Sequence, residues 1–379
     1  MSTVQEAAQA ARTWLGEVGL PHWGTAGVDD SGSFHERFLF DGRPDTDCPR
    51  RMRVQARQLY VYSEAAARGW WVGARAVADR GFEALVRDCW AKDGRPGFLH
   101  TFTQDKAPLD FRRDTYDHAF GLFALAWYYK ATKEPRALAL ALEILDLLDR
   151  DLADPASGGF VESVPPVLPR RSDPHMHLLE ASLEWTEAGG GPRFLALASR
   201  MTALFKSHFF DRDTGTLREF FAADLGPAEG PPGQVVAPGH HFEWSWLLAW
   251  AGRSGAGDAR AEAQALYDYG VRHGLDAQGF AIDECDRHGR QVRLSRRAWP
   301  QTELIKAYLN QASQGDPVAA EAAGKLTLNF LDTYLATEVP GLWMDQFDAE
   351  GRGMTATAPA STLYHVKVAF RELILFAGA

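Results

Sequence analysis

Six polar clusters recur at nearly even spacing along the 379-residue chain, each at or near the start of an apolar helical run. Their anchor residues are Arg57, His118, His177, His240, Gln301 and His365. Consecutive anchors are separated by 61, 59, 63, 61 and 64 residues. A period of this regularity predicts one structural unit that is repeated six times, with one polar residue of each unit directed at a common centre.

The histidines of these clusters could transfer protons at neutral pH, where imidazole changes its charge. His240 and Glu243 are three positions apart and would share one face of a helix. Such a pair could bind a metal ion, or the carboxylate could orient the imidazole and raise its pKa. The chain has no His-Glu-x-x-His spacing. We therefore expect acid/base chemistry without a metal or another cofactor.

Other chemistries fit the motifs less well. Paired carboxylates for glycoside cleavage would combine Glu243 with Asp117 or Asp345, but histidines outnumber acids in the clusters. The chain has no Gly-x-Ser-x-Gly motif, no phosphate-binding loop and no Gly-x-Gly-x-x-Gly motif. Tyr116 and Trp299, beside the clusters, could stack on the apolar face of a sugar ring. A neutral monosaccharide is the ligand that this set of residues favours.

Apolar residues at three- and four-residue spacing predict twelve helices, at 3–19, 50–69, 71–91, 115–132, 135–153, 174–188, 191–210, 238–252, 258–274, 298–313, 317–336 and 362–377. Several alternate members are rich in Ala and Leu with a charged stripe, whereas those that carry the clusters are aromatic and apolar on most sides. This alternation predicts an outer and an inner ring of helices in one domain, residues 1–379. Inner helices that all run in one direction would present the clusters at one rim, under long loops with short strand-like segments. Their N-termini would favour a developing oxyanion there.

The bulk composition excludes several classes of partner. A net charge of −10 and a pI near 5.7 disfavour nucleic acid. The three cysteines, Cys48, Cys89 and Cys285, lack metal-type spacing and fit a reducing compartment. The first residues do not resemble a signal peptide, and the most apolar stretch, 137–148, contains two acids. We expect a cytoplasmic monomer or homodimer that does not bind a membrane.

Four segments resemble the N-acylglucosamine 2-epimerase family: residues 54–62, 174–181 and 239–246, and the pair Tyr364-His365. That family includes metal-free mannose isomerases, related aldose–ketose isomerases, and cellobiose and mannose 2-epimerases. The resemblance covers essentially the whole chain in the same order. It implies an all-α fold, the (α/α)6 barrel of six helical hairpins.

The family motif carries over to Arg57, His177, His240, Glu243 and His365. The resemblance implies that His240 and His365 form the acid/base pair, that Glu243 supports His240, and that Arg57 and His177 bind substrate oxygens. The clusters themselves add the substrate-binding candidates His118, Trp299, Gln301, Tyr116 and Asp117.

Residues 360–365 resemble the isomerase branch of the family, which implies interconversion of D-mannose with D-fructose, or of D-lyxose with D-xylulose, through a cis-enediolate. The alternatives are a sugar 2-epimerase, a glycoside hydrolase and a sugar-binding protein without catalysis. Free sugars are favoured over phosphorylated ones, because the acidic chain lacks an obvious phosphate clamp.

Overall fold

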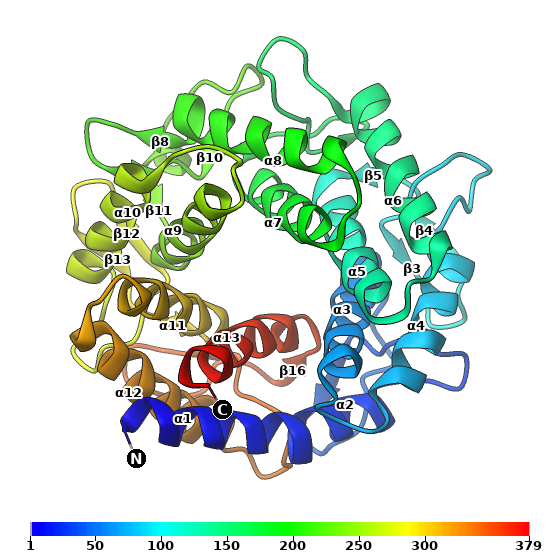
Figure 1. Ribbon diagram of the computed structural model, residues 1–379, viewed down its shortest axis with the longest axis horizontal. Helices are drawn as coiled ribbons and strands as arrows, with labels where there is room; N and C mark the ends of the chain where they lie inside the picture. Colours follow the sequence, from blue (N-terminus) through cyan, green and yellow to red (C-terminus); the bar gives the residue numbers. More distant parts are fainter. Residues whose placement is uncertain (1, 379) are drawn as a thin grey trace.

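The structure, a computed structural model, describes residues 2–378, and its helices form two concentric rings (Figure 1). The inner ring consists of α3 (Met52–Arg68), α5 (Thr115–Thr132), α7 (Asp173–Ala188), α9 (Pro238–Arg253), α11 (Ala298–Ser313) and α13 (Ser361–Ala377). The outer ring consists of α1 (Thr3–Thr13), α4 (Ala74–Cys89), α6 (Pro135–Leu147), α8 (Pro192–Leu204), α10 (Arg260–His273) and α12 (Pro317–Tyr334). The predicted (α/α)6 barrel is confirmed.

The ring is closed by the two ends of the chain. Five hairpins pair consecutive helices, but the sixth is formed by α1 and α13, and α1 also packs against α12. π-helical turns extend three outer helices, at Trp14–Gly19, Leu148–Leu152 and Phe205–Phe209. The helix predicted at 3–19 therefore continues through such a turn into α2 (Leu20–Thr25). None of the helices within residues 2–378 is long and apolar enough to cross a membrane.

Burial explains the difference in composition between the rings. In α5 every residue from Asp117 to Tyr128 is buried, because this helix contacts both inner neighbours and its outer partner. In α6 the buried positions, such as Ala137, Leu140 and Ile144, follow helical spacing, and the opposite face is largely exposed.

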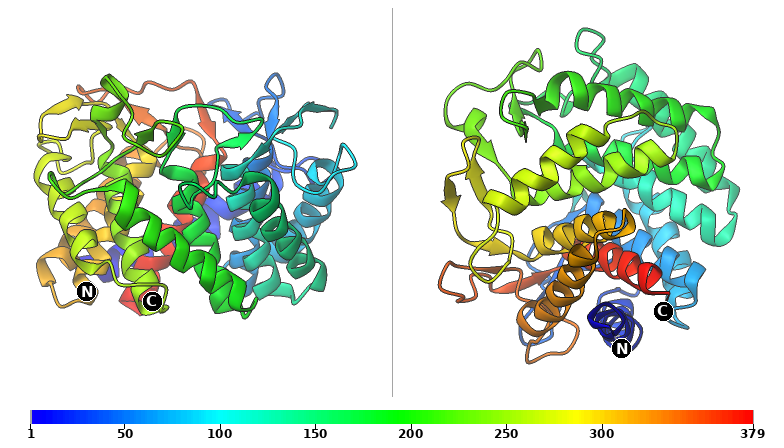
Figure 2. Two further views of the ribbon diagram at one scale, coloured as in Figure 1. Left: turned by 90° about the horizontal axis from the view of Figure 1, so that it is seen from above. Right: turned by 60° about the vertical axis from the view of Figure 1, so that its left-hand side comes forward.

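Short antiparallel strands cover one rim of the barrel (Figure 2). They are β1 (Arg37–Leu39), β2 (Arg50–Arg51), β3 (Thr101–Phe102), β4 (Pro108–Asp110), β5 (Arg113–Asp114), β6 (Ser163–Val164), β7 (Arg170–Arg171), β8 (Phe210–Asp211), β9 (Thr216–Leu217), β10 (Phe220–Phe221), β11 (Val235–Val236), β12 (Glu284–Asp286), β13 (Gln291–Arg293), β14 (Arg296–Arg297), β15 (Gln346–Phe347) and β16 (Thr357–Pro359). In all six repeats the strand before an inner helix pairs with the strand after its outer partner: β1 with β16, β2 with β3, β5 with β6, β7 with β10, β11 with β12, and β14 with β15.

One residue in each covering loop, here called a bridging residue, connects neighbouring inner helices. The six are Glu36, His100, Glu162, Glu219, Asp283 and Asp345. The backbone carbonyls of five of them accept a hydrogen bond, at 2.8–3.2 Å, from the first residue of an inner helix or, at α7 and α13, from the residue just before it. The remaining inner helix, α9, begins at Pro238, which has no N–H to donate. The bridging side chains bind at or just before the next inner helix, as Glu36 binds Arg51 and Asp345 binds Thr362.

A second set of contacts holds the loops down onto the helices. In five repeats a polar side chain in the first turn of the inner helix accepts a loop N–H at 2.7–3.1 Å. These side chains are Gln55, His118, His175, His241 and Gln301. Burial lowers the pKa of the three histidines to about 3 to 4, so each is neutral and accepts through Nε2. His118 and Gln301, predicted to bind substrate, instead bind the backbone of Phe98 and Ala281.

Replacing Gln301 with Leu should lower the free energy of unfolding by about 2–3 kcal/mol, because it leaves the buried N–H and carbonyl of Ala281 without a partner. Urea denaturation followed by far-UV circular dichroism measures the change. The exposed Gln9→Leu is the matched control and should stay within about 0.5 kcal/mol. Equal stability of the two variants would show that the Gln301 contact does not hold the loop.

Candidate active site

A cavity of about 670 Å³ opens among the first turns of the inner helices and the loops that cover them. Seven of the ten predicted site residues line it: Arg57, Tyr116, His177, His240, Glu243, Trp299 and His365. Loop residues, among them Glu219, Phe220 and Asp283, form the rest of the wall. A cavity of this size and mixed polarity suits a small polar ligand.

The six residues that lie in register around the barrel axis are Arg57, Phe120, His177, Glu243, Glu303 and His365. Arg57, Phe120, Glu243 and Glu303 follow by five positions the first residue of their inner helices, and His177 and His365 follow by five positions the residue just before theirs. The six anchor residues identified from the sequence do not all occupy this position. His118 and Gln301 lie two positions before Phe120 and Glu303, and His240 lies three positions before Glu243. Two positions on an α-helix differ by about 200°, so His118 and Gln301 point away from the axis.

His240 is held by a carboxylate from a loop. Its Nδ1 lies 2.8 Å from Glu219 Oε2, and its Nε2 lies 3.9 Å from Asp173 Oδ1. Burial by itself would lower the pKa of His240, but Glu219, Asp173 and Glu243 raise it to about 9. His240 is therefore an imidazolium at neutral pH and can donate a proton.

The carboxylate that contacts His240 directly is Glu219, whereas the predicted supporting residue Glu243 acts on His240 only through its charge. Glu243, on the same helix, makes no hydrogen bond to His240 and lies deeper, against His177 and Glu303. In three other repeats the bridging carboxylate binds an arginine before the helix: Arg51, Arg171 and Arg297. In the α9 repeat the residue before the helix is Ala237, which has no charged side chain. Glu219 therefore accepts the N–H of Ala237 and contacts His240 in place of an arginine.

His365 has the opposite charge state. Its Nδ1 lies 2.8 Å from Glu303 Oε1. Burial, with Arg57 and Lys306 nearby, lowers the pKa of His365 to about 4 although Glu303 opposes the shift. His365 is thus a neutral base at the pH at which His240 is an acid. Both imidazoles lie against Trp299, at ring-centroid distances of 5.0 and 5.6 Å. Divergent pKa values within one cavity are typical of an acid/base pair.

The floor of the cavity carries several buried charges. His177 Nδ1 lies 3.0 Å from Glu180 Oε2, and its Nε2 lies 3.4 Å from Asp173 Oδ1. Burial disfavours the imidazolium, but Tyr116, Asp173 and Glu180 raise the pKa of His177 well above its ordinary value. Burial and the neighbouring Glu303 raise the pKa of Glu243. The floor can therefore offer hydrogen-bond donors to sugar oxygens.

Arg57 supplies a cation without a carboxylate partner among the described residues. Its Nη2 donates to the Tyr116 hydroxyl at 2.6 Å, and its Nη1 lies 3.4 Å from the Ser361 carbonyl. The Phe120 ring lies 4.0 Å from the guanidinium carbon. This geometry leaves Arg57 able to bind an oxyanion in the cavity.

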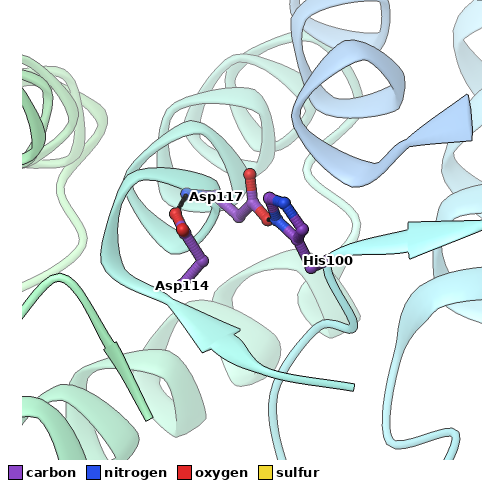
Figure 3. Close-up of side chains that lie close together, drawn as sticks. All are labelled: His100, Asp114 and Asp117. Atoms are coloured by element: carbon purple, nitrogen blue, oxygen red, sulfur yellow. Dashed lines mark hydrogen bonds and ion pairs between the residues drawn. The ribbon is translucent and has the colours of Figure 1, made fainter. Parts of the chain in front are cut away.

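Asp117, predicted to bind substrate, serves the loop instead. Its carboxylate lies 2.6 Å from Arg53 Nε and 2.6 Å from His100 Nδ1. Its backbone N–H donates to Asp114, which caps α5 (Figure 3). Asp117 is fully buried and lies outside the cavity lining.

Sequence reasoning missed Glu219, Glu303 and Asp173. Glu219 occupies the same place in its strand-like segment as Glu162 and Asp283 do in theirs, and Glu303 follows Gln301 by two positions. Aligning the strand-like loop segments would have identified Glu219, and aligning the helix starts would have identified Glu303. Asp173 offers no such signal, since the equivalent residues are as different as Arg53, Tyr116 and Trp299.

Residues 32–369 match the model of a protein family, N-acylglucosamine 2-epimerase. The chain belongs to this family. A protein of Rhizobium meliloti named mannose-6-phosphate isomerase is 36% identical over 373 residues, 95% of each chain. A cellobiose 2-epimerase structure from Spirochaeta thermophila superposes with a TM-score of 0.88 at 23% identity, covering 99% of this chain and 98% of the other. A D-mannose isomerase structure gives 0.83 at 17% identity, with 97% of both chains covered.

Family membership makes this chain an enzyme of the sugar isomerase and epimerase group. In this family member the acid/base candidates His240 and His365 come from α9 and α13, and their carboxylate partners come from a loop and from α11. The reactive part of the site is therefore assembled from four separate segments of the chain.

Replacing Glu219 with Gln should lower the pKa of His240 from about 9, because burial is then opposed only by the charges of Asp173 and Glu243. Nitrogen-15 NMR titration of the imidazole measures this shift. The control is Glu284→Gln, a cavity residue paired with Arg293, which should leave His240 unchanged. An unaltered His240 titration in Glu219→Gln would contradict the assigned partner.

Proposed function

We propose that this protein is an aldose–ketose isomerase that converts free D-mannose to D-fructose, with D-lyxose to D-xylulose as a related reaction. The main support for this proposal is that His240 and His365 lie against the same residue, Trp299, and are in opposite charge states at neutral pH. The 36% identity to a protein named mannose-6-phosphate isomerase supports the isomerase assignment.

The reaction begins with opening of the sugar ring, in which protons move between O1 and O5. The His240 imidazolium can protonate O5 while a carboxylate or imidazole in the cavity accepts the O1 proton. Trp299 and Tyr116 line the wall and can hold the apolar face of the sugar.

Isomerisation then needs one base at carbon. Nε2 of His365 removes the C2 proton, the C1 carbonyl becomes part of a cis-enediolate, and the same base returns the proton to C1. A second acid/base group, His240, carries a proton from O2 to O1, so that C2 becomes the carbonyl and C1 the alcohol. The roles agree with the charge states of the two residues at neutral pH.

Arg57 and His177 stabilise the enediolate. Arg57 has no carboxylate partner among residues 2–378, and His177 is held protonated on the same floor. A well-placed donor at a developing oxyanion contributes about 3 kcal/mol to the transition state. The inner-helix N-termini around the cavity act in the same direction.

The charge of the cavity favours an unphosphorylated sugar. The other two arginines that line the cavity are already paired, Arg293 with Glu284 and Arg297 with Asp283, both at 3.0 Å. Arg57, which lacks such a partner within the described residues, lies among the reacting groups. A phosphate at the far end of the substrate would meet carboxylates without an uncommitted cation, at an electrostatic penalty.

Epimerisation at C2 is the second candidate. The His240 imidazolium lies in the same cavity as the base His365 and could return a proton to C2 from the other face. The family name and the relatives named cellobiose 2-epimerase support this alternative.

Incubation with D-mannose in heavy water, followed by NMR, tests both candidates. We expect fructose with deuterium at C1, because His365 exchanges its proton with solvent between the two transfers. Glucose with deuterium at C2 would indicate epimerisation. Mannose 6-phosphate, as the matched substrate, should react with a kcat/KM at least about tenfold lower. Absence of both fructose and glucose among the products would refute both proposals.

Replacing His365 or His240 with Asn should lower kcat by about 10³-fold, the usual contribution of an acid or base, and leave the circular dichroism spectrum unchanged. The exposed His288→Asn is the control and should retain full activity. Near-normal turnover in either active-site variant would overturn its assigned role.

A further inference from the structure

We propose that Lys306 is a positioning residue of the reaction, whose buried ammonium holds Glu303 against His365 and keeps this imidazole a proton acceptor. The proposal rests on the proposed function of His365 as the base. Lys306 belongs to none of the motifs that identify the family in this sequence, and it lies beneath the cavity lining.

The three residues form a linear chain of contacts. Lys306 Nζ lies 2.5 Å from Glu303 Oε2, and Glu303 Oε1 lies 2.8 Å from His365 Nδ1. Lys306 and Glu303 are one turn apart on α11, which packs against α13. With one oxygen bound to a cation, Glu303 stays ionised and accepts the Nδ1–H of His365. The lone pair of the ring is then on Nε2, the atom that faces the cavity.

The charges around this chain show why a cation is needed. Lys306 faces Glu303 on its own helix, Glu243 on α9 and Glu180 on α7, and its Nζ lies 4.2 Å from the Trp246 ring centre. His365 faces Glu303, Glu243, Arg57 on α3 and the neutral Tyr364. Without Lys306, His177 would be the main cation left to counter Glu180 and Glu243. The site would then take up a proton, and His365 is the basic group beside Glu303.

The same donor atoms resemble a metal site. One atom each from Glu243, Glu303 and His365 lies within 4.8 Å of the others, and His177, Glu180 and Glu243 form a second such group. Lys306 is fully buried at Glu303, next to both groups, and supplies the positive charge that a cation would otherwise provide. An ammonium gives no Lewis acidity, so its effect is confined to the charge state and orientation of its neighbours.

The decisive experiment compares Lys306→Met, which removes the charge at similar volume, with Lys306→Arg, which retains it. In Lys306→Met the acid limb of the kcat/KM profile should move to higher pH by at least about one unit, because His365 then holds its proton more tightly. kcat should fall at least about tenfold, with KM changed much less. In Lys306→Arg the acid limb of the kcat/KM profile should stay at its wild-type pH. Lys306→Gln replaces the Met variant if that variant does not fold.

Lys367→Met is the matched control. Lys367 is equally buried and is ion-paired with Glu64, and neither residue lines the cavity. Its loss should lower thermal stability and leave the acid limb in place. If the acid limb of the kcat/KM profile stays at its wild-type pH in both Lys306→Met and Lys306→Gln, Lys306 only forms a structural ion pair and the proposal is overturned.

Nitrogen-15 NMR of the His365 ring separates this proposal from the proposed function. In the wild type the ring should remain largely neutral at pH 5, whereas in Lys306→Met about half of the rings or more should be protonated at that pH. That result without any sugar turnover would reject the isomerase assignment and retain the role of Lys306. A neutral His365 in both proteins would reject the role of Lys306 even if mannose is isomerised.

Discussion

The arrangement of this barrel depends on how the buried N-termini of its inner helices are satisfied. A helix start leaves several N–H groups without an intrahelical partner, and burial without partners is costly. Five bridging residues accept an N–H at one helix start through their carbonyls, and four of the six side chains accept an N–H just before the next inner helix, so that consecutive inner helices are connected at the rim. The same contacts fix the loops, and the loops in turn form the wall of the cavity.

The candidate active site forms where this repeated arrangement changes. At α9 the helix begins with Pro238 and is preceded by Ala237 instead of arginine. The bridging residue Glu219 is thereby released from an ion pair with arginine and binds His240. The bridging position, which pairs with an arginine in three other repeats, thus holds a candidate catalytic histidine in this one. The imidazole gains its raised pKa from a carboxylate that elsewhere in the ring only stabilises the fold.

Buried charge is distributed along the barrel axis in compensated groups. At the cavity floor Glu180, Glu243 and Glu303 are opposed by Lys306 and His177. Farther along the inner helices a second group pairs Glu64 with Lys367 and Arg371. Isolated ions would be unstable in such surroundings, and mutual compensation allows each group to keep an unusual protonation state. The neutral His365 and the protonated His177 are both consequences of this compensation.

The sequence by itself determined the fold and much of the candidate site. Helical periodicity and the contrast between inner and outer helices are local properties, so the twelve predicted helices correspond to observed ones with small changes at the ends. Arg57, His177 and His365 could be named because they belong to contiguous motifs.

The tertiary structure decided which neighbouring residues face the axis and which partners they meet. A shift of two positions turns a side chain to the other face of its helix, so His118 and Gln301 hold loops while Phe120 and Glu303 face inward. Glu219 lies 21 residues from His240, and Glu303 lies 62 residues from His365. These contacts join different repeats, and only closure of the ring brings them together.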